Sequence, residues 1–333
     1  STGHKTVGIY LENSSGKSSY IGNGKIEVSN QAIGLYSKGE NDLVVNVEAT
    51  GAKTTGIFVD KASNIGGTVT AENGAIAVYG DGGKLNIGVG TATDLTLKTT
   101  AGVATGMYLT SGAYAAGGDI NIENTTANKN IGVYYSKGTG SSAVANGSKI
   151  NIKDGNTIGI YAADGITLVN NSNITSAVGQ SDSIASYVGG GSQLTSNGTI
   201  TLNDTSGGIG IYTEEGKGIN SGTITLNGTA GSMVGMASEA KAGKTAVVEN
   251  TNVITAGNNL GMYIAGAGAS SGRNTGSITA TGTGTGVYID GSGNSFDGTG
   301  GTITSNAVGI YLKNTDTNKI TAGTLNIASG GVG

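Results

Sequence analysis

One short motif recurs along almost the whole chain: a small residue between aliphatic residues, with an aromatic residue two positions later. It reads VGIY at 7–10 and again at 308–311, and variants such as TGIFV at 55–59 fall between them. From Gly8 to Gly333 the small residue recurs in 13 steps over 325 residues, a mean of 25 residues per step. A repeat of this length indicates a solenoid or a similar array of repeats. We therefore expect residues 1–333 to form one repeat segment.

Each repeat also contains a second short run in which apolar and polar residues alternate. Examples are KINI (149–152), GTITL (198–202) and GTITS (301–305), and a weaker third run is seen as DLVVN (42–46) and TAVVE (245–249). Alternation with period 2 is typical of half-buried strands, and the Gly-, Asn- and Ser-rich stretches between the runs are typical of turns. The sequence therefore predicts an all-β fold: a right-handed parallel β-helix of about thirteen rungs, each of roughly 25 residues.

Other repeat architectures fit the composition less well. The chain has 63 glycines in 333 residues, which opposes helical repeats because glycine destabilises a helix interior. The leucine ladder of a leucine-rich repeat is missing, and the period is too short for a propeller blade. Proline, which cannot donate a hydrogen bond to a neighbouring strand, is absent from the sequence. These features favour stacked strands throughout.

The motif also predicts which side chains face outward. In TVGIYL, Val7, Ile9 and Leu11 alternate with Gly8 and Tyr10. Because successive side chains of a strand point to opposite faces, we expect the aliphatic residues to point into the coil and the glycine and tyrosine to point out. A bare glycine track would then run beside the aromatic residues, which would cover it.

Stacked coils would place the aromatic residues of the motif above one another, in a row that we call the aromatic ladder. The row is interrupted once, at Ala237. Its predicted members are Tyr10, Tyr36, Phe58, Tyr79, Tyr108, Tyr134, Tyr161, Tyr187, Tyr212, Tyr263, Tyr288 and Tyr311. One interpretation is that the ladder stiffens the solenoid, and another is that it forms a flat strip that binds sugar rings or a partner protein. A reversed register, with the tyrosines inside, is a third alternative.

Candidate catalytic and metal-binding groups are sparse. The acidic residues come close together only at Glu40 and Asp42, at Glu214 and Glu215, and in DGSGNSFD (290–297), and each group is interpreted as a solvated turn. The one histidine, His4, lies near the start of the chain, and cysteine is absent. The only arginine, Arg273, leaves little for bidentate recognition of anions. We therefore expect no catalytic residues, no metal site and no cofactor.

The net charge of −4 and the pI of about 5.1 argue against binding to nucleic acid or to an anionic membrane surface. No signal peptide or transmembrane segment is evident, and the first motif begins abruptly at Val7. The expectation is therefore a segment of a longer solenoid. Three irregular stretches, 80–94, 111–119 and 136–149, are predicted to be protruding loops that could bind a partner or be tolerated insertions.

The repeated xIGIYxx and GTIT motifs, the absence of cysteine and the excess of lysine over arginine resemble the passenger domains of type V autotransporters. The resemblance covers nearly the whole chain and is strongest to the large fusobacterial autotransporter adhesins. It implies a rod-like, virulence-associated monomer on the bacterial cell surface, held in the outer membrane by a C-terminal translocator barrel outside this sequence. It also implies adhesion to a glycan or protein receptor on host cells, or to partner bacteria.

Two other functions remain open at this point. One is a purely structural stalk or spacer within such a passenger. The other is a polysaccharide-cleaving β-helix enzyme, which would need clustered carboxylates on consecutive coils. The resemblance supplies no motif for a binding site, so it assigns no binding residues.

Overall fold

The computed structural model describes residues 6–88, 94–137, 142–144, 149–313 and 317–333. The described residues form strands and turns, and none of them forms a helix that could cross a membrane. Contacts between Cα atoms divide the chain into unit 1, Ser1–Tyr161, and unit 2, Ala162–Gly333. Each unit is a stack of coils whose strands pair in parallel with those of the next coil. The predicted parallel β-helix is confirmed, with about 12 turns of roughly 25 residues.

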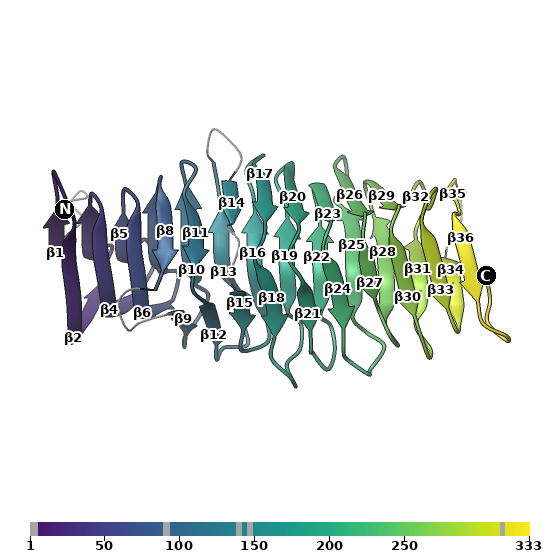
Figure 1. The fold of residues 1–333 in the computed structure, drawn as a ribbon, viewed down its shortest axis with the longest axis horizontal. Helices are drawn as coiled ribbons and strands as arrows, with labels where there is room; N and C mark the ends of the chain where they lie inside the picture. The colour runs from purple at the N-terminus through teal and green to yellow at the C-terminus, as the bar shows by residue number, and fades with distance from the viewer. Residues whose placement is uncertain (1–5, 89–93, 138–141, 145–148, 314–316) are drawn as a thin grey trace. The chain divides into compact units, whose positions relative to one another are not determined.

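The first sheet carries the recurring motif. In unit 1 its strands are β1 (Val7–Glu12), β3 (Ile33–Lys38), β5 (Thr55–Val59), β7 (Ile76–Asp81), β10 (Thr105–Thr110), β13 (Asn130–Tyr135) and β16 (Thr157–Ala162). In unit 2 they are β19 (Ile184–Val188), β22 (Ile209–Thr213), β25 (Val234–Ala240), β28 (Leu260–Gly266), β31 (Thr285–Asp290) and β34 (Val308–Lys313). Within each unit, the strands of successive coils lie side by side (Figure 1).

The second sheet carries the alternating runs. In unit 1 it contains β2 (Ser18–Ser29), β4 (Asn41–Thr50), β6 (Ser63–Glu72), β8 (Lys84–Ile87), β9 (Leu95–Thr99), β11 (Tyr114–Gly117), β12 (Ile120–Asn124) and β15 (Lys149–Ile152). In unit 2 it contains β18 (Asn173–Ser176), β21 (Ile200–Leu202), β24 (Thr223–Leu226), β27 (Val253–Thr255), β30 (Ser277–Ala280), β33 (Thr302–Ser305) and β36 (Thr324–Ile327). The long strand β6 pairs with both β8 and β9, so one strand of an early coil corresponds to two strands of the next.

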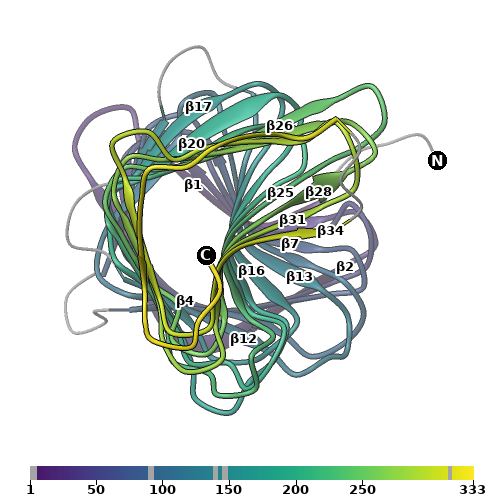
Figure 2. The same cartoon turned by 90° about the vertical axis from the view of Figure 1, so that its right-hand side faces the viewer.

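The third sheet completes the coils of unit 2. Its strands are β17 (Thr167–Asn170), β20 (Ser192–Ser196), β23 (Gly216–Asn220), β26 (Thr245–Asn250), β29 (Ala269–Asn274), β32 (Ser295–Asp297) and β35 (Lys319–Thr321). In unit 1 the short strand β14 (Ser142–Val144) belongs to it. The end-on view places β26 on a different side of the coil from β28, β31 and β34 (Figure 2). The weak third run at 245–249 is therefore a strand, as predicted.

The core of unit 2 is built from residues that occupy the same position in successive coils. Ile224 pairs with Ile254, Ile254 with Ile278, and Ile278 with Ile303, and all four side chains are buried. This in-register stacking follows from the constant repeat, because each coil buries its apolar face against the next. A polar row lies buried at the end of the third-sheet strands. There, Asn220 Nδ2 donates to Asn250 Oδ1 at 2.8 Å, and Asn250 Nδ2 donates to Asn274 Oδ1 at 2.8 Å.

The predicted outward glycine track is wrong. The registers pair Val7 with Ile33 and Ile9 with Leu35 and pass over the glycine between them, and Ile33, Gly34 and Leu35 are all buried. The period-2 rule therefore fails at this residue. A Cβ built on Gly235 would lie 2.6 Å from the carbonyl oxygen of Gly261, and the next contact would be a core isoleucine. Glycine is used here because the backbones of neighbouring coils approach closely on the core side.

The predicted loops differ from the structure in two of three places. The stretch 80–94 contains β8, which pairs with β6, and only 89–93 lie outside the described residues. The stretch 111–119 contains β11, whose Ala115 is fully buried. The sequence of these two stretches suggests loops because glycine flanks each short strand. In the structure, pairing with adjacent coils holds both strands in the sheet. Most of 136–149 lies outside the described residues, as does His4.

Candidate functional site

The aromatic ladder of unit 1 is a continuous stack. From Tyr10 through Phe58 to Tyr161, successive rings have their centroids 4.7–5.3 Å apart, with interplanar angles of 8–27°. From Tyr36 to Tyr161 the residues beside the rings in the strands are buried and the rings themselves are half-buried, whereas in the first strand Tyr10 is 51% exposed and its neighbours Ile9 and Leu11 are half-buried. The predicted outward register of the aromatic residues is therefore confirmed, and the alternative with the tyrosines inside is wrong.

The ladder of unit 2 is interrupted where it was expected to be. Tyr187 and Tyr212 precede Ala237 in the row, and Tyr263, Tyr288 and Tyr311 follow it. The two ring pairs nearest the gap are tilted, by 35° for Tyr187–Tyr212 and 39° for Tyr263–Tyr288. Ala237 itself is only 2% exposed. The side chains around the gap therefore cover the small residue and leave no open slot.

Stacking limits what the ladder can bind. A sugar ring packs on the face of an aromatic ring, but each interior ring of the unit 1 stack has both faces covered by its neighbours. A phenol group of the ladder can also be engaged within the chain. In unit 2, Tyr212 donates a hydrogen bond from its phenol to Glu239 at 3.1 Å, and burial raises the pKa of this phenol strongly. This geometry suits a stiffening role better than face-on recognition of sugars.

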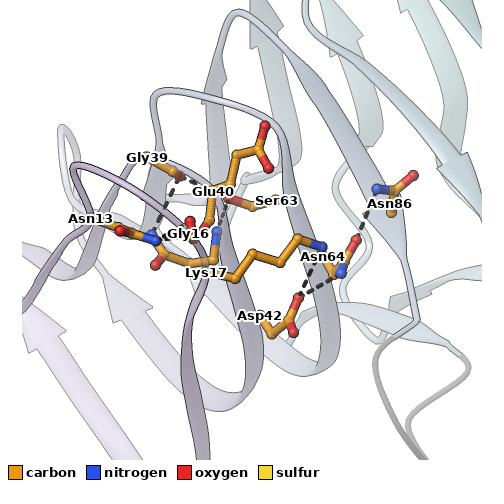
Figure 3. A network of polar contacts seen from close by, with 10 residues as sticks. Asn13, Gly16, Lys17, Gly39, Glu40, Asp42, Ser63, Asn64 and Asn86 are labelled. Carbon is orange, nitrogen blue, oxygen red and sulfur yellow. Dashed lines mark hydrogen bonds and ion pairs between the residues drawn. The ribbon is translucent and has the colours of Figure 1, made fainter.

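The acidic groups expected to be solvated turns are instead mostly paired. Near Glu40, Lys17 reaches toward Asp42 with 3.8 Å between Nζ and the carboxylate (Figure 3). Asn64 Nδ2 donates to Asp42 at 2.5 Å, and Asn86 Nδ2 donates to Asn64 Oδ1 at 2.8 Å, so a row of amides ends on a carboxylate. The Glu40 side chain is exposed and points away from this row in Figure 3. Only Glu40 fits the prediction of a solvated acid in this group.

The other two acidic groups lie in unit 2 and are also paired. Lys241 binds Glu214 at 2.7 Å, and Lys244 binds Glu215 at 2.9 Å. In the stretch 290–297, Lys313 binds Asp290 at 3.1 Å. Within the described ranges, no three His, Cys, Asp or Glu residues form a group that could hold a metal ion.

The strongest candidate site is a shallow depression on the third sheet of unit 2, which we call the charged trough. It encloses about 470 Å³ and extends over five consecutive coils, from β23 to β35. Two outward-facing columns form it. The first column consists of Lys217, Val247, Ser271, Ser295 and Lys319, and the second contains Glu249, Arg273, Asp297 and Thr321.

Charges of opposite sign alternate along the second column. Glu249 is buried and binds two cations, Arg273 Nη1 through one oxygen and Lys217 Nζ through the other, both at 2.6 Å. Arg273 Nε also lies 3.9 Å from Asp297, at the long limit for an ion pair. Because the strands are parallel and in register, residues about 24 positions apart in the sequence become neighbours here.

The electrostatics hold both carboxylates in the charged form. Burial acts to raise the pKa of Glu249, but the hydrogen bonds from Lys217 and Arg273 outweigh it, and the pKa lies below its ordinary value. Hydrogen bonds from Thr299 lower the pKa of Asp297, and Arg273 lowers it further. Neither carboxyl group is tuned to hold a proton near neutral pH, as a general acid would be.

Sequence reasoning missed the charged trough because it considered Arg273 alone. The signal lies in the repeat: Glu249, Arg273 and Asp297 occupy the same position of three successive third-sheet strands. Aligning the weak third run of each repeat would have placed them in one column. No protein-family model, curated protein or solved structure matches the chain.

Proposed function

We propose that this chain is a non-enzymatic adhesive segment of a bacterial surface protein of the autotransporter type. In this proposal it attaches the cell to host cells or to partner bacteria, and its ligand contacts lie in the charged trough. The observation that carries the proposal is the trough itself, where a regular scaffold of paired strands holds five charged side chains on one face. A scaffold of this kind keeps a contact surface rigid, which lowers the entropic cost of binding.

The charge state of the trough supports binding rather than cleavage. A polysaccharide-cleaving enzyme of the usual two-carboxylate kind needs one carboxyl group with a raised pKa to protonate the leaving oxygen. The pKa values of Glu249 and Asp297 are both lowered, and both oxygens of Glu249 are engaged by cations. The two carboxylates of the trough are therefore suited to fixing the positions of Lys217 and Arg273.

A structural spacer is the second candidate function, and the aromatic ladder favours it. The faces of stacked rings contact one another and are not accessible to a ligand, and each stacked pair adds about 0.5–1.5 kcal/mol of stability beyond its burial. On this view the chain extends a binding region that lies elsewhere in the protein.

A binding experiment separates the two functions. The labelled full chain is added to epithelial cells and to a panel of bacteria, with unlabelled chain as competitor. An adhesive segment gives saturable, competable binding that falls when Arg273 and Lys319 are both replaced by glutamine. The matched control is Lys61→Gln, which removes an exposed lysine from unit 1. Absence of binding by chain that circular dichroism shows to be folded would support the spacer.

A further inference from the structure

Two features of the charged trough indicate what kind of ligand it fits. The first is the size of the side chains along its first column. Val247, Ser271 and Ser295 are small, and they lie between lysines at the two ends, Lys217 and Lys319. Neighbouring strands are about 4.8 Å apart, so the two lysines are about 19 Å apart along the stack. The trough is therefore long, shallow and open, which suits an extended chain better than a compact small molecule.

The second feature is an unbalanced positive charge. Lys217 is engaged by Glu249, and Arg273 lies between Glu249 and Asp297. Lys319 is exposed and forms no ion pair with any residue that the structure describes. Three cations thus face two carboxylates, in a chain whose net charge is −4. The surplus charge lies on Lys319 in β35, the last coil of the trough. The Arg273 side chain, 49% exposed, lies in the middle coil, β29, two coils or about 10 Å away along the stack.

The surface between the charges is lined with hydroxyl groups. Ser271 and Ser295 form no side-chain hydrogen bond within the described part of the chain, so both hydroxyls are available to a ligand. Thr321 adds an exposed hydroxyl at the same end. The aromatic side chain beneath, Phe296, is only 1% exposed and offers no apolar pocket. Apart from Glu249 and Asp297, whose carboxylates face Lys217 and Arg273, the polar groups of the trough are hydroxyls and cations. Such a surface without apolar pockets matches a polyhydroxylated acid better than a peptide, whose side chains would find no pocket.

We propose that the charged trough binds an oligosaccharide of sugar acids, with one carboxylate held between Arg273 and Lys319. Arg273 binds this carboxylate through the exposed part of its guanidinium, whose Nε lies at the long distance of 3.9 Å from Asp297, and Lys319 adds a second charge-assisted hydrogen bond. The sugar hydroxyls exchange hydrogen bonds with Ser271 and Ser295, and Glu249 keeps Lys217 and Arg273 in place. This inference rests on the proposed adhesive function, because it names the class of ligand for the same site.

The test titrates the full chain with a tetrasaccharide of a hexuronic acid and follows binding by calorimetry. Saturable binding is expected to weaken as salt is raised, because the contact is electrostatic. The methyl ester of the same tetrasaccharide, in which every carboxylate is neutralised, is expected not to bind. Equal binding of acid and ester would overturn the inference. So would tighter binding of an oligoglutamate peptide, which would identify a peptide as the occupant.

Three variants assign the binding to the charged trough. Lys319→Gln and Arg273→Gln are each expected to weaken binding roughly tenfold, the loss of one charge-assisted hydrogen bond. Ser295→Asp, which places a negative charge in the first column, is expected to abolish it. The control Lys61→Gln should bind like the unmodified chain. Lys319 has no ion pair to lose within the described residues, so unchanged affinity of its variant would place the ligand elsewhere.

The cell assay distinguishes failure of this inference from failure of the proposed function. If cells bind the chain and the hexuronate neither competes nor binds, the ligand class is wrong and the adhesive function stands. If the hexuronate binds in solution at Arg273 and Lys319 but cells and bacteria do not bind the chain, the inference about the trough holds and the adhesive function fails.

Discussion

Replacement of Gly261 by alanine is expected to destabilise unit 2, although Gly261 lies in a β-strand, where alanine is usually harmless. A Cβ at this position would lie 2.5 Å from the carbonyl oxygen of Gly286 and closer still to the Cγ2 atom of Ile278. The first atom belongs to the backbone of a paired strand, and the second to a fully buried side chain. Neither can move away without disturbing the next coil.

The expected magnitude follows from two opposing terms. Forcing an extra methyl group into a packed core costs about 1–3 kcal/mol. Removing the freedom of a glycine from the unfolded chain returns about 0.4–1 kcal/mol. The net loss for Gly261→Ala is therefore about 1–2 kcal/mol. Alanine does occupy the equivalent positions 77 and 185, where it is buried. The energetic cost of a methyl group therefore depends on whether the side chains around it can move, and Ile278 would lie especially close to a Cβ at position 261.

Urea unfolding of the full chain, followed by circular dichroism, measures this loss as a lower midpoint. Gly24→Ala is the matched control, because a Cβ there would meet nothing within 4 Å. An outward-facing glycine, as simple alternation predicts, would make the two variants behave alike, with midpoints equal to or above that of the unmodified chain. A Gly261→Ala midpoint that did not fall would therefore refute the inward, close-packed position of this glycine.

Three further perturbations test other parts of the fold by the same unfolding assay. Asn250→Ala breaks the buried amide row and strands its partners, so stability is expected to fall by about 2–4 kcal/mol, and an unchanged midpoint would contradict the row. Ala237→Tyr places a large ring where surrounding side chains already cover a residue that is 2% exposed, so stability is expected to fall by about 1–3 kcal/mol, and a raised midpoint would show that Tyr212 and Tyr263 move apart to admit the ring. The lowered pKa of Glu249 stabilises the fold above the unfolded value of about 4.3, and this stabilisation is lost as the pH falls through the folded pKa. Glu249→Gln should therefore be destabilised near neutral pH and should show a weaker loss of stability on acidification than the unmodified chain.

The fold could be predicted from the sequence because a constant period carries both strand order and register. Once Tyr263 and Tyr288 are recognised as equivalent, parallel pairing places their rings next to each other, and the structure has them so. The alternation rule failed at the glycines because it assumes that every residue of a strand pairs with a residue of the neighbouring strand. The registers instead pass over positions such as Gly34, which turns an expected outward residue toward the core.

The candidate site was harder to predict for a different reason. Glu249 and Arg273 lie 24 residues apart in the sequence, and they can be recognised as neighbours only when the third strands of successive coils are aligned. That strand has the weakest pattern in the sequence, since its inward positions include Gly272 and Asn274 rather than a regular aliphatic series. The side-chain ion pairs also depend on rotamers, which a one-dimensional pattern does not contain.

The in-register stacking has a consequence for how the gene of such a protein can change. Ile254, Ile278 and Ile303 occupy equivalent positions in three successive coils. Recombination between two repeats therefore removes or adds whole coils and joins equivalent positions of the repeat to each other. Such an event changes the number of coils and leaves the frame of inward and outward positions intact. A loss of one residue within a strand, by contrast, would turn its core side chains outward. Whole-coil recombination can therefore change which side chains follow one another in the outward columns while the core residues keep their inward positions.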